Sequence, residues 1–215
     1  GIHAVKKHLP FKLCKADFRL NPQCRKFLSI GLPLALQEFL TQLSFLALCA
    51  FVNRLGLEAS SGYGVACKIV NFAMLIPSAL MQSMAAFVSQ NIGADSKKRA
   101  RQSMFTGIGI GLAFGCAVFV NAFAYLKGFA PETIATAVLF SMVGYFNGNN
   151  KTVWVMVQGL VQTLLVRLPM AYFMSIQPNA SLTMIGLAAP TSTAVGIVLN
   201  ICFYFYFERT SRSDS

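Results

Sequence analysis

The sequence contains few charged residues. Only 12% of its 215 residues are Asp, Glu, Lys or Arg, and only 7 of these are acidic, whereas 55% of the chain is hydrophobic. The mean hydropathy is +0.59. Soluble domains carry about 25% charged residues, with which they cover their water-exposed surface. A chain with this composition does not fold as an ordinary soluble domain, and its composition favours a membrane protein.

Motifs that would indicate an enzyme or a metal protein are also missing. The two histidines, His3 and His8, form no known ligand pattern with the cysteines, and no C-x-x-C spacing occurs among Cys14, Cys24, Cys49, Cys67, Cys116 and Cys202. The glycine-rich stretch between Gly107 and Gly115 follows no predicted strand, and no acidic residue comes after it at the distance a nucleotide site requires. No hydrolase nucleophile motif or phosphate-binding loop occurs. We therefore expect neither an enzyme nor a bound cofactor or metal.

The sequence instead contains apolar segments long enough to cross a membrane as helices. A span needs about 20 apolar residues, and we place six spans at about 27–52, 62–88, 103–121, 132–147, 152–176 and 182–207. The predicted fold is all-α: residues 28–208 form one polytopic lobe of six transmembrane helices, between a basic linker (1–27) and a tail (209–215). Pro77 is expected to bend the second span. Gly111 and Gly115, spaced i and i+4, favour a close helix crossing in lipid.

Basic residues predict the orientation of these spans. With both ends in the cytoplasm, fourteen basic residues lie inside, against Arg54 and Lys127 outside, as the positive-inside rule requires. The run Lys97–Arg101 could be read as a nucleic-acid patch, but two membrane-length segments flank it, so we expect membrane lipids and no nucleic acid as partners. The linker either lies along the anionic membrane surface or is a solvated connector. We predict a multi-pass protein of the inner (plasma) membrane.

Polar residues inside the spans are the candidate functional residues. Glu38 lies near the middle of the first span, where a carboxylate faces a hydrated cavity, carries a proton or has a partner. It is the ion-coupling candidate, although a hydrogen bond to a neighbouring helix remains an alternative. The candidate cavity-lining residues are the other polar side chains at membrane depth: Thr41, Gln42, Asn71, Gln82, Thr136, Gln158, Gln162 and Arg167.

Four stretches together resemble one transporter family. Residues 30–45 (IGLPLALQEFLTQLSF), 86–102 (AFVSQNIGADSKKRARQ), 144–152 (GYFNGNNKT) and 164–173 (LLVRLPMAYF) are similar, in this order, to the carboxyl-terminal half of multidrug and toxic compound extrusion (MATE) transporters, particularly the DinF-like branch. The resemblance implies two six-helix lobes around a central cavity. It also implies that protons or sodium ions flowing inward drive the export of small cationic or amphiphilic drugs by alternating access. This chain would then need the missing amino-terminal six-helix lobe as its partner.

The sequence departs from the family's pattern in three places. The segment 1–27 resembles the bridge between the lobes, with no first lobe before it. The passage 121–131 (NAFAYLKGFAP) lacks the family's usual outer loop. Glu38 lies about one turn from the seventh-helix carboxylate of the NorM-like branch, whose tenth-helix aspartate aligns with Thr136, so a complete ion site does not carry over. Two alternatives therefore remain: a relative of lipid-linked flippases, and a truncated membrane scaffold without transport activity.

Overall fold

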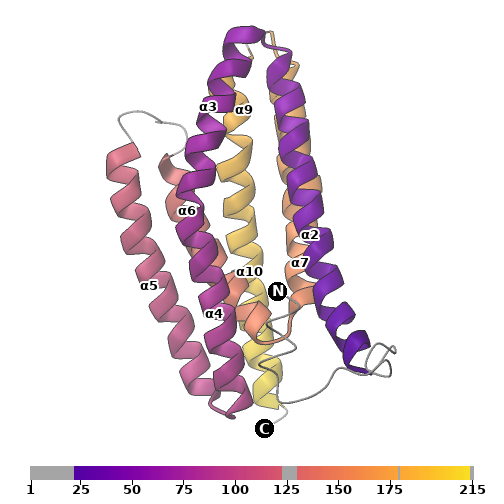
Figure 1. Ribbon diagram of the computed structural model, residues 1–215, viewed down its shortest axis with the longest axis vertical. Coiled ribbons are helices and arrows are strands. Elements are labelled where there is room, and N and C mark those ends of the chain that lie inside the picture. Colours follow the sequence, from indigo (N-terminus) through magenta and orange to yellow (C-terminus); the bar gives the residue numbers. More distant parts are fainter. Residues whose placement is uncertain (1–21, 123–129, 179, 214–215) are drawn as a thin grey trace, which may run out of the picture.

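The regular elements of the described residues are all helices. The computed structural model describes residues 22–122, 130–178 and 180–213, and Figure 1 shows its long helices running side by side. In chain order they are α2 (Pro22–Asn53), α3 (Leu57–Ala73), α4 (Leu75–Gly93), α5 (Lys97–Ala122), α6 (Ala130–Gly148), α7 (Thr152–Leu160), the π-helix η2 (Val161–Arg167), α8 (Leu168–Ser175), α9 (Leu182–Gly186) and α10 (Ala188–Ser213). The predicted all-α fold is confirmed.

Several of these elements continue one another, so the chain makes six passes within the described residues. The passes are α2, α3 with α4, α5, α6, α7 with η2 and α8, and α9 with α10. Four of them contain segments long and apolar enough to cross a membrane: Cys24–Asn53, Leu57–Gly93, Thr152–Ser175 and Met184–Thr210. The turn between α2 and α3 lies at one end of the bundle, and the turn between α4 and α5 lies at the other with the end of α10 (Figure 1).

The second pass is interrupted between α3 and α4, a few residues before Pro77. Proline has no backbone N–H, and its ring clashes with the carbonyl four residues earlier, which for Pro77 is that of Ala73. Helix α3 ends at Ala73 and α4 begins at Leu75, while the Met74 N–H still donates to the Val70 carbonyl at 2.9 Å. The helix is therefore interrupted about one turn before the proline, and the bend itself stays a prediction.

Two predicted boundaries are wrong. We expected turn structure from Gln90 and a basic loop, but α4 continues to Gly93, and the basic residues Lys97–Arg101 form the first turns of α5. Lysine, arginine and alanine are good helix formers, so this run continues into the next helix instead of lying in a loop. The outer loop expected at 53–61 is likewise only a short turn before α3. Of the outer turn expected at 121–132, residues 123–129 lie outside the described residues, as does most of the linker; residues 121–122 belong to α5 and 130–132 to α6.

Glycines bring α4, α5 and α6 into close contact. A Cβ atom on Gly115 would lie 3.0 Å from Ile134 Cα, and one on Gly111 would lie 3.2 Å from the Ala137 carbonyl oxygen. The predicted helix crossing at Gly111 and Gly115 is thus confirmed, with α6 as the neighbour. Gly144 and Gly148, which no sequence pattern singled out, bring α6 still closer to α4, since a Cβ atom on them would lie 2.6 Å from the Met81 carbonyl oxygen and from Val88 Cβ, respectively. Small residues are the usual means by which helices approach closely in membranes.

The apolar core is divided into two clusters. The first joins α4, α5, α6 and α7 through Met84, Val88, Ala100, Met104, Leu139, Met142, Val143, Tyr145, Phe146 and Val155. The second joins α2, α8, α9 and α10 through Leu48, Val52, Ala171, Ile185 and Ala188. Along α7 to α8 and along α10, most of the buried residues between these clusters are polar: Gln158, Gln162, Thr163, Arg167, Ser192, Thr193 and Asn200. The interior of the bundle therefore has a polar layer between two apolar ones.

Candidate functional site

Glu38 lies on the outer surface of the bundle. Its side chain is exposed on α2, and its Oε1 accepts a hydrogen bond of 2.7 Å from Gln42 Nε2. The preceding residue, Gln37, instead packs toward α7, because a Cβ atom on Gly159 would lie 2.8 Å from Gln37 Cγ. Within the described ranges, Glu38 is the carboxylate that is exposed near the middle of a membrane-length helix. Contact with lipid at that position is unfavourable by about 2.5 to 3.5 kcal/mol on insertion scales.

The other predicted residues fall into two groups. Gln42, Asn71 and Gln82 are exposed on α2, α3 and α4, and Thr41 is half-buried with its Oγ1 donating to the Gln37 carbonyl at 2.9 Å. In contrast, Thr136, Gln158, Gln162 and Arg167 are buried inside the bundle. The nine candidates therefore do not form one cluster, and their roles in ion coupling or in lining a cavity stay predictions.

Two of the buried residues form an amide pair between α7, η2 and α10. Gln158 Nε2 donates to Gln162 Oε1 at 2.6 Å. Gly196 of α10 makes room for this pair, since a Cβ atom on it would lie 2.7 Å from Gln158 Nε2 and 2.8 Å from Gln162 Oε1. Glycine at this position thus permits a buried pair of amides where a larger residue would force the helices apart.

Arg167 lies inside the bundle and is only 6% exposed. Its Nε donates to Ser192 Oγ at 3.1 Å, and its guanidinium carbon lies 5.0 Å from the centre of the Phe45 ring. A cation over an aromatic face is attracted by the electrons of the ring. Helices α2 and α10 therefore both hold the guanidinium group that η2 carries.

Glu132 is a buried charged residue that the sequence analysis placed only at the outer edge of a span. It lies in the first turn of α6 and is 3% exposed. Its Oε2 has no hydrogen-bond partner among the described residues, and the same is true of Arg167 Nη1. Because Glu132 stands at the first position of the predicted span 132–147, the depth argument that singled out Glu38 did not apply to it.

The π-helical turn η2 is the second feature that sequence reasoning missed. It covers Val161–Arg167 and carries both Gln162 and Arg167. Single π-helical turns within α-helices occur often at functional sites. The spacing of Gln158, Gln162 and Arg167, four residues and then five, fits a turn that is locally wider than an α-helix.

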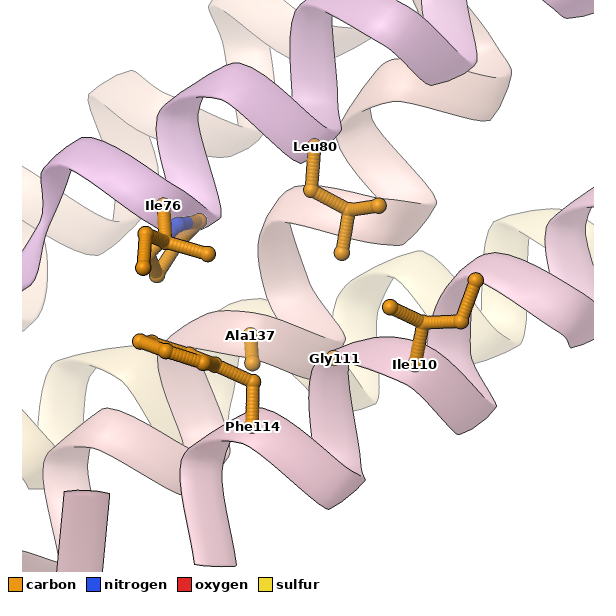
Figure 2. A pocket seen from close by; sticks show the side chains of 7 residues that line it. Ile76, Leu80, Ile110, Gly111, Phe114 and Ala137 are labelled. Carbon is orange, nitrogen blue, oxygen red and sulfur yellow. The ribbon is translucent and has the colours of Figure 1, made fainter. Parts of the chain in front are cut away.

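The remaining charges and the one described cavity do not add to this site. Glu208 pairs with Arg101 at 3.4 Å and accepts a 3.3 Å hydrogen bond from Tyr204 at the end of α10. An apolar cavity of about 40 Å³ lies between α4, α5 and α6, and Figure 2 shows Ile76 and Leu80 near Phe114 and Ile110 around it. Because its lining is apolar, the cavity suits no ion. Among the described residues, no group of three or more His, Cys, Asp or Glu could hold a metal.

Comparisons with known proteins point to one transporter family. The model of the MatE family matches residues 33–130. The chain is 29% identical over 92 residues to the multidrug resistance protein MdtK of Photorhabdus laumondii, covering 43% of this chain and 20% of that protein. It is also 29% identical over 124 residues to the probable multidrug resistance protein NorM of Aromatoleum aromaticum, covering 55% of this chain and 26% of that protein.

The fold is similar to part of a solved MATE structure. The crystal structure of MATE in complex with Br-NRF superposes with a TM-score of 0.79 at 14% identity, covering 93% of this chain and 49% of that chain. The chain thus spans about half the length of this solved protein and matches about a quarter or less of the two relatives. It is a helical, multi-pass membrane protein similar in sequence and fold to MATE transporters, a family of transporters rather than enzymes.

Proposed function

We propose that the chain is the carboxyl-terminal six-helix lobe of a MATE-type multidrug exporter of the DinF-like branch. In the complete transporter this lobe and an amino-terminal lobe move against each other by alternating access, exchanging an inward-moving proton or sodium ion for an outward-moving drug. The observation that carries the proposal is the exposed Glu38 on α2. A carboxylate that is exposed in the middle of a membrane-length helix is expected to face water or another protein segment instead of lipid.

The surroundings of Glu38 fit an ion-coupling role. Gln42 donates one hydrogen bond to the carboxylate, and no cation within the described residues forms an ion pair with Glu38. A proton or a sodium ion that reaches the carboxylate through a hydrated cavity neutralises it, and its departure restores the charge. Binding energy that differs between two states of the transporter is what couples ion flow to a conformational change.

The exposed polar groups favour a cationic substrate. Carboxylate and amide side chains at Glu38, Gln42, Asn71 and Gln82 attract cations or donate single hydrogen bonds, whereas lipid-linked phosphates require clustered arginine and lysine. Lys68 is exposed, but Arg167 is buried and engaged with Ser192 and Phe45. A flippase is therefore the less favoured alternative. In this proposal both ends of the chain lie in the cytoplasm, because the positive-inside rule places the side with most of the basic residues there.

The test is Glu38→Gln in a complete transporter that contains this lobe, reconstituted in vesicles with an imposed proton or sodium gradient. The variant preserves shape and removes the charge, so drug binding should persist while export loses its dependence on the gradient. Glu58→Gln is the matched control, because it removes an equally exposed carboxylate from the first turn of α3. Gradient-driven export that is unchanged in Glu38→Gln would refute the coupling role, and loss of drug binding would indicate a substrate contact instead.

A further inference from the structure

The apolar cavity between α4, α5 and α6 borders the outer surface of the bundle. Ile76 of α4 and Ile110 of α5 line it, and these side chains are 49% and 57% exposed (Figure 2). A water molecule needs a cavity of about 10 to 15 Å³, whereas one of about 150 Å³ holds benzene. At about 40 Å³, this cavity has room for a methyl or methylene group, and its apolar lining does not suit water.

Arg99 lies on the same face of α5 as Ile110, closer to the end of the bundle where α4 turns into α5. Eleven residues separate the two positions, which is three helical turns to within about 20° and a rise of about 16 Å. Gly107 brings the adjacent side of α5 against α4, since a Cβ atom on it would lie 2.6 Å from Met84 Sδ. The basic side chain and the cavity therefore lie along one seam between α4 and α5.

The side chains along this seam between Arg99 and Ile110 offer no free hydroxyl donor. Ser103 Oγ donates to the Arg99 carbonyl at 2.8 Å, and Thr106 Oγ1 donates to the Gln102 carbonyl at 3.0 Å. On α4, Phe87 is 56% exposed and stands eleven residues after Ile76, so these two also share a face. The seam between the basic end and the cavity thus suits an apolar chain.

Arg99 is available to bind an anion. Its side chain is exposed, and within the described ranges it forms no ion pair, in contrast to Arg101, which pairs with Glu208 at 3.4 Å. Lys98 next to it is exposed too, and Asp95 is the acidic residue in this turn. Arginine binds phosphate through two parallel hydrogen bonds. Basic residues at the end of a membrane-crossing helix attract the headgroups of anionic lipids.

We propose that an anionic phospholipid binds along the seam between α4 and α5, with its phosphate on Arg99 and the end of one acyl chain in the apolar cavity. The dimensions agree, because one leaflet is about 15 Å of the roughly 30 Å hydrocarbon core, and Arg99 is about 16 Å from Ile110 along the helix. The site uses none of the residues proposed for ion coupling and does not depend on transport.

A phosphatidylglycerol with a photoreactive diazirine at the end of one acyl chain tests this site. The purified chain is reconstituted in phosphatidylcholine vesicles that contain a trace of the probe, and mass spectrometry measures labelling of residues 76–80 and 110–114. Phosphatidylglycerol should label them about fivefold more than a phosphatidylcholine probe with the same chains. Unlabelled phosphatidylglycerol should compete to saturation, whereas inorganic phosphate at millimolar concentration should not.

Two pairs of variants separate the headgroup from the acyl chain. Arg99→Gln should reduce labelling to the phosphatidylcholine level, whereas the matched control Lys98→Gln, about 100° around the helix, should keep most of it. Ala137→Val adds two methyl groups to the wall of the cavity and should also reduce labelling. Its control is Ala113→Val, because Ala113 is exposed on α5 and does not line the cavity.

Four results would overturn the proposal. Equal labelling by the two probes would indicate ordinary contact with bulk lipid, and equal effects of Arg99→Gln and Lys98→Gln would indicate general surface charge. Competition by inorganic phosphate would indicate a phosphate site that does not recognise lipid. Equal labelling of folded Ala137→Val and Ala113→Val would place the acyl chain outside the cavity. If Ala137→Val does not fold, the exposed pair Arg99→Gln and Lys98→Gln decides.

Discussion

Three glycines in α5 and α6 give the packing of the bundle a graded test. Gly148→Ala places a Cβ atom 2.6 Å from Val88 Cβ and 2.8 Å from the Ala85 carbonyl oxygen. Neither neighbour can swing aside, because one is backbone and the other is a Cβ atom attached to it. Restoring an ordinary contact of 3.4 Å requires α4 and α6 to separate by about 0.8 Å, the difference between 3.4 and 2.6 Å.

The expected loss of stability follows from two opposing effects. Overpacking of a well-packed core destabilises by about 1 to 3 kcal/mol, whereas replacing glycine with alanine inside a helix stabilises by up to about 1 kcal/mol. We expect Gly148→Ala to lower the free energy of unfolding by about 1 to 2 kcal/mol. Gly109→Ala is the matched control, because a Cβ atom there has no neighbour within 4 Å, so this variant should be neutral or slightly stabilised.

Gly107→Ala lies between these two cases. Its new Cβ atom would lie 2.6 Å from Met84 Sδ, which is near the end of a flexible side chain that can change rotamer. The order of stability should therefore be Gly109→Ala, then Gly107→Ala, then Gly148→Ala. Unfolding by sodium dodecyl sulfate, followed by circular dichroism in mixed micelles, measures the three free energies. Equal stability of Gly148→Ala and Gly109→Ala would refute the close contact between α4 and α6.

Two further predictions concern the contacts of Trp154 with α10 and the orientation of the chain in the membrane. Trp154→Phe keeps an aromatic ring to stack on Phe203, but it removes the indole N–H that donates to buried Asn200 Oδ1 at 3.1 Å. In the same assay the free energy of unfolding should fall by about 1 to 3 kcal/mol. A variant as stable as the wild type would contradict this expectation. In a cysteine-free background, an impermeant thiol reagent added outside intact cells should label Ser61→Cys and not Lys98→Cys, and the reverse pattern would invert the topology.

Hydropathy predicted the helices because four of the six passes contain a long apolar run, and turn residues or charges mark the ends of the passes. The helix crossing at Gly111 and Gly115 was also predictable, since it depends on side-chain size. The interruption at Met74 lies close to Pro77, where the sequence led us to expect an irregularity in the helix. The start of α5 at Lys97 was missed because the basic residues that mark the cytoplasmic side also form helix readily. Charge indicates a side of the membrane, and it does not indicate a loop.

The separation of the polar residues into buried and exposed groups could not be read from the sequence. In a membrane-length helix both the lipid-facing side and the protein-facing side are apolar, so hydropathy does not show which face is inside. The burial of both Glu132 and Arg167 depends on how segments far apart along the chain pack together. Only the fold, with Ser192 and Phe45 around the guanidinium group, shows that Arg167 lies inside the bundle.

The central claim is that this chain is one lobe of a two-lobe exporter, and growth of a drug-hypersensitive bacterium in a cationic dye tests it most directly. The strain would express the chain alone, the chain with the first six-helix lobe of a MATE transporter supplied in trans, or that pair carrying Glu38→Gln. We expect dye resistance only from the unmodified pair, because alternating access requires two bundles around a shared site. Resistance from the lone chain that Glu38→Gln abolishes would contradict this account and would establish a working homodimer.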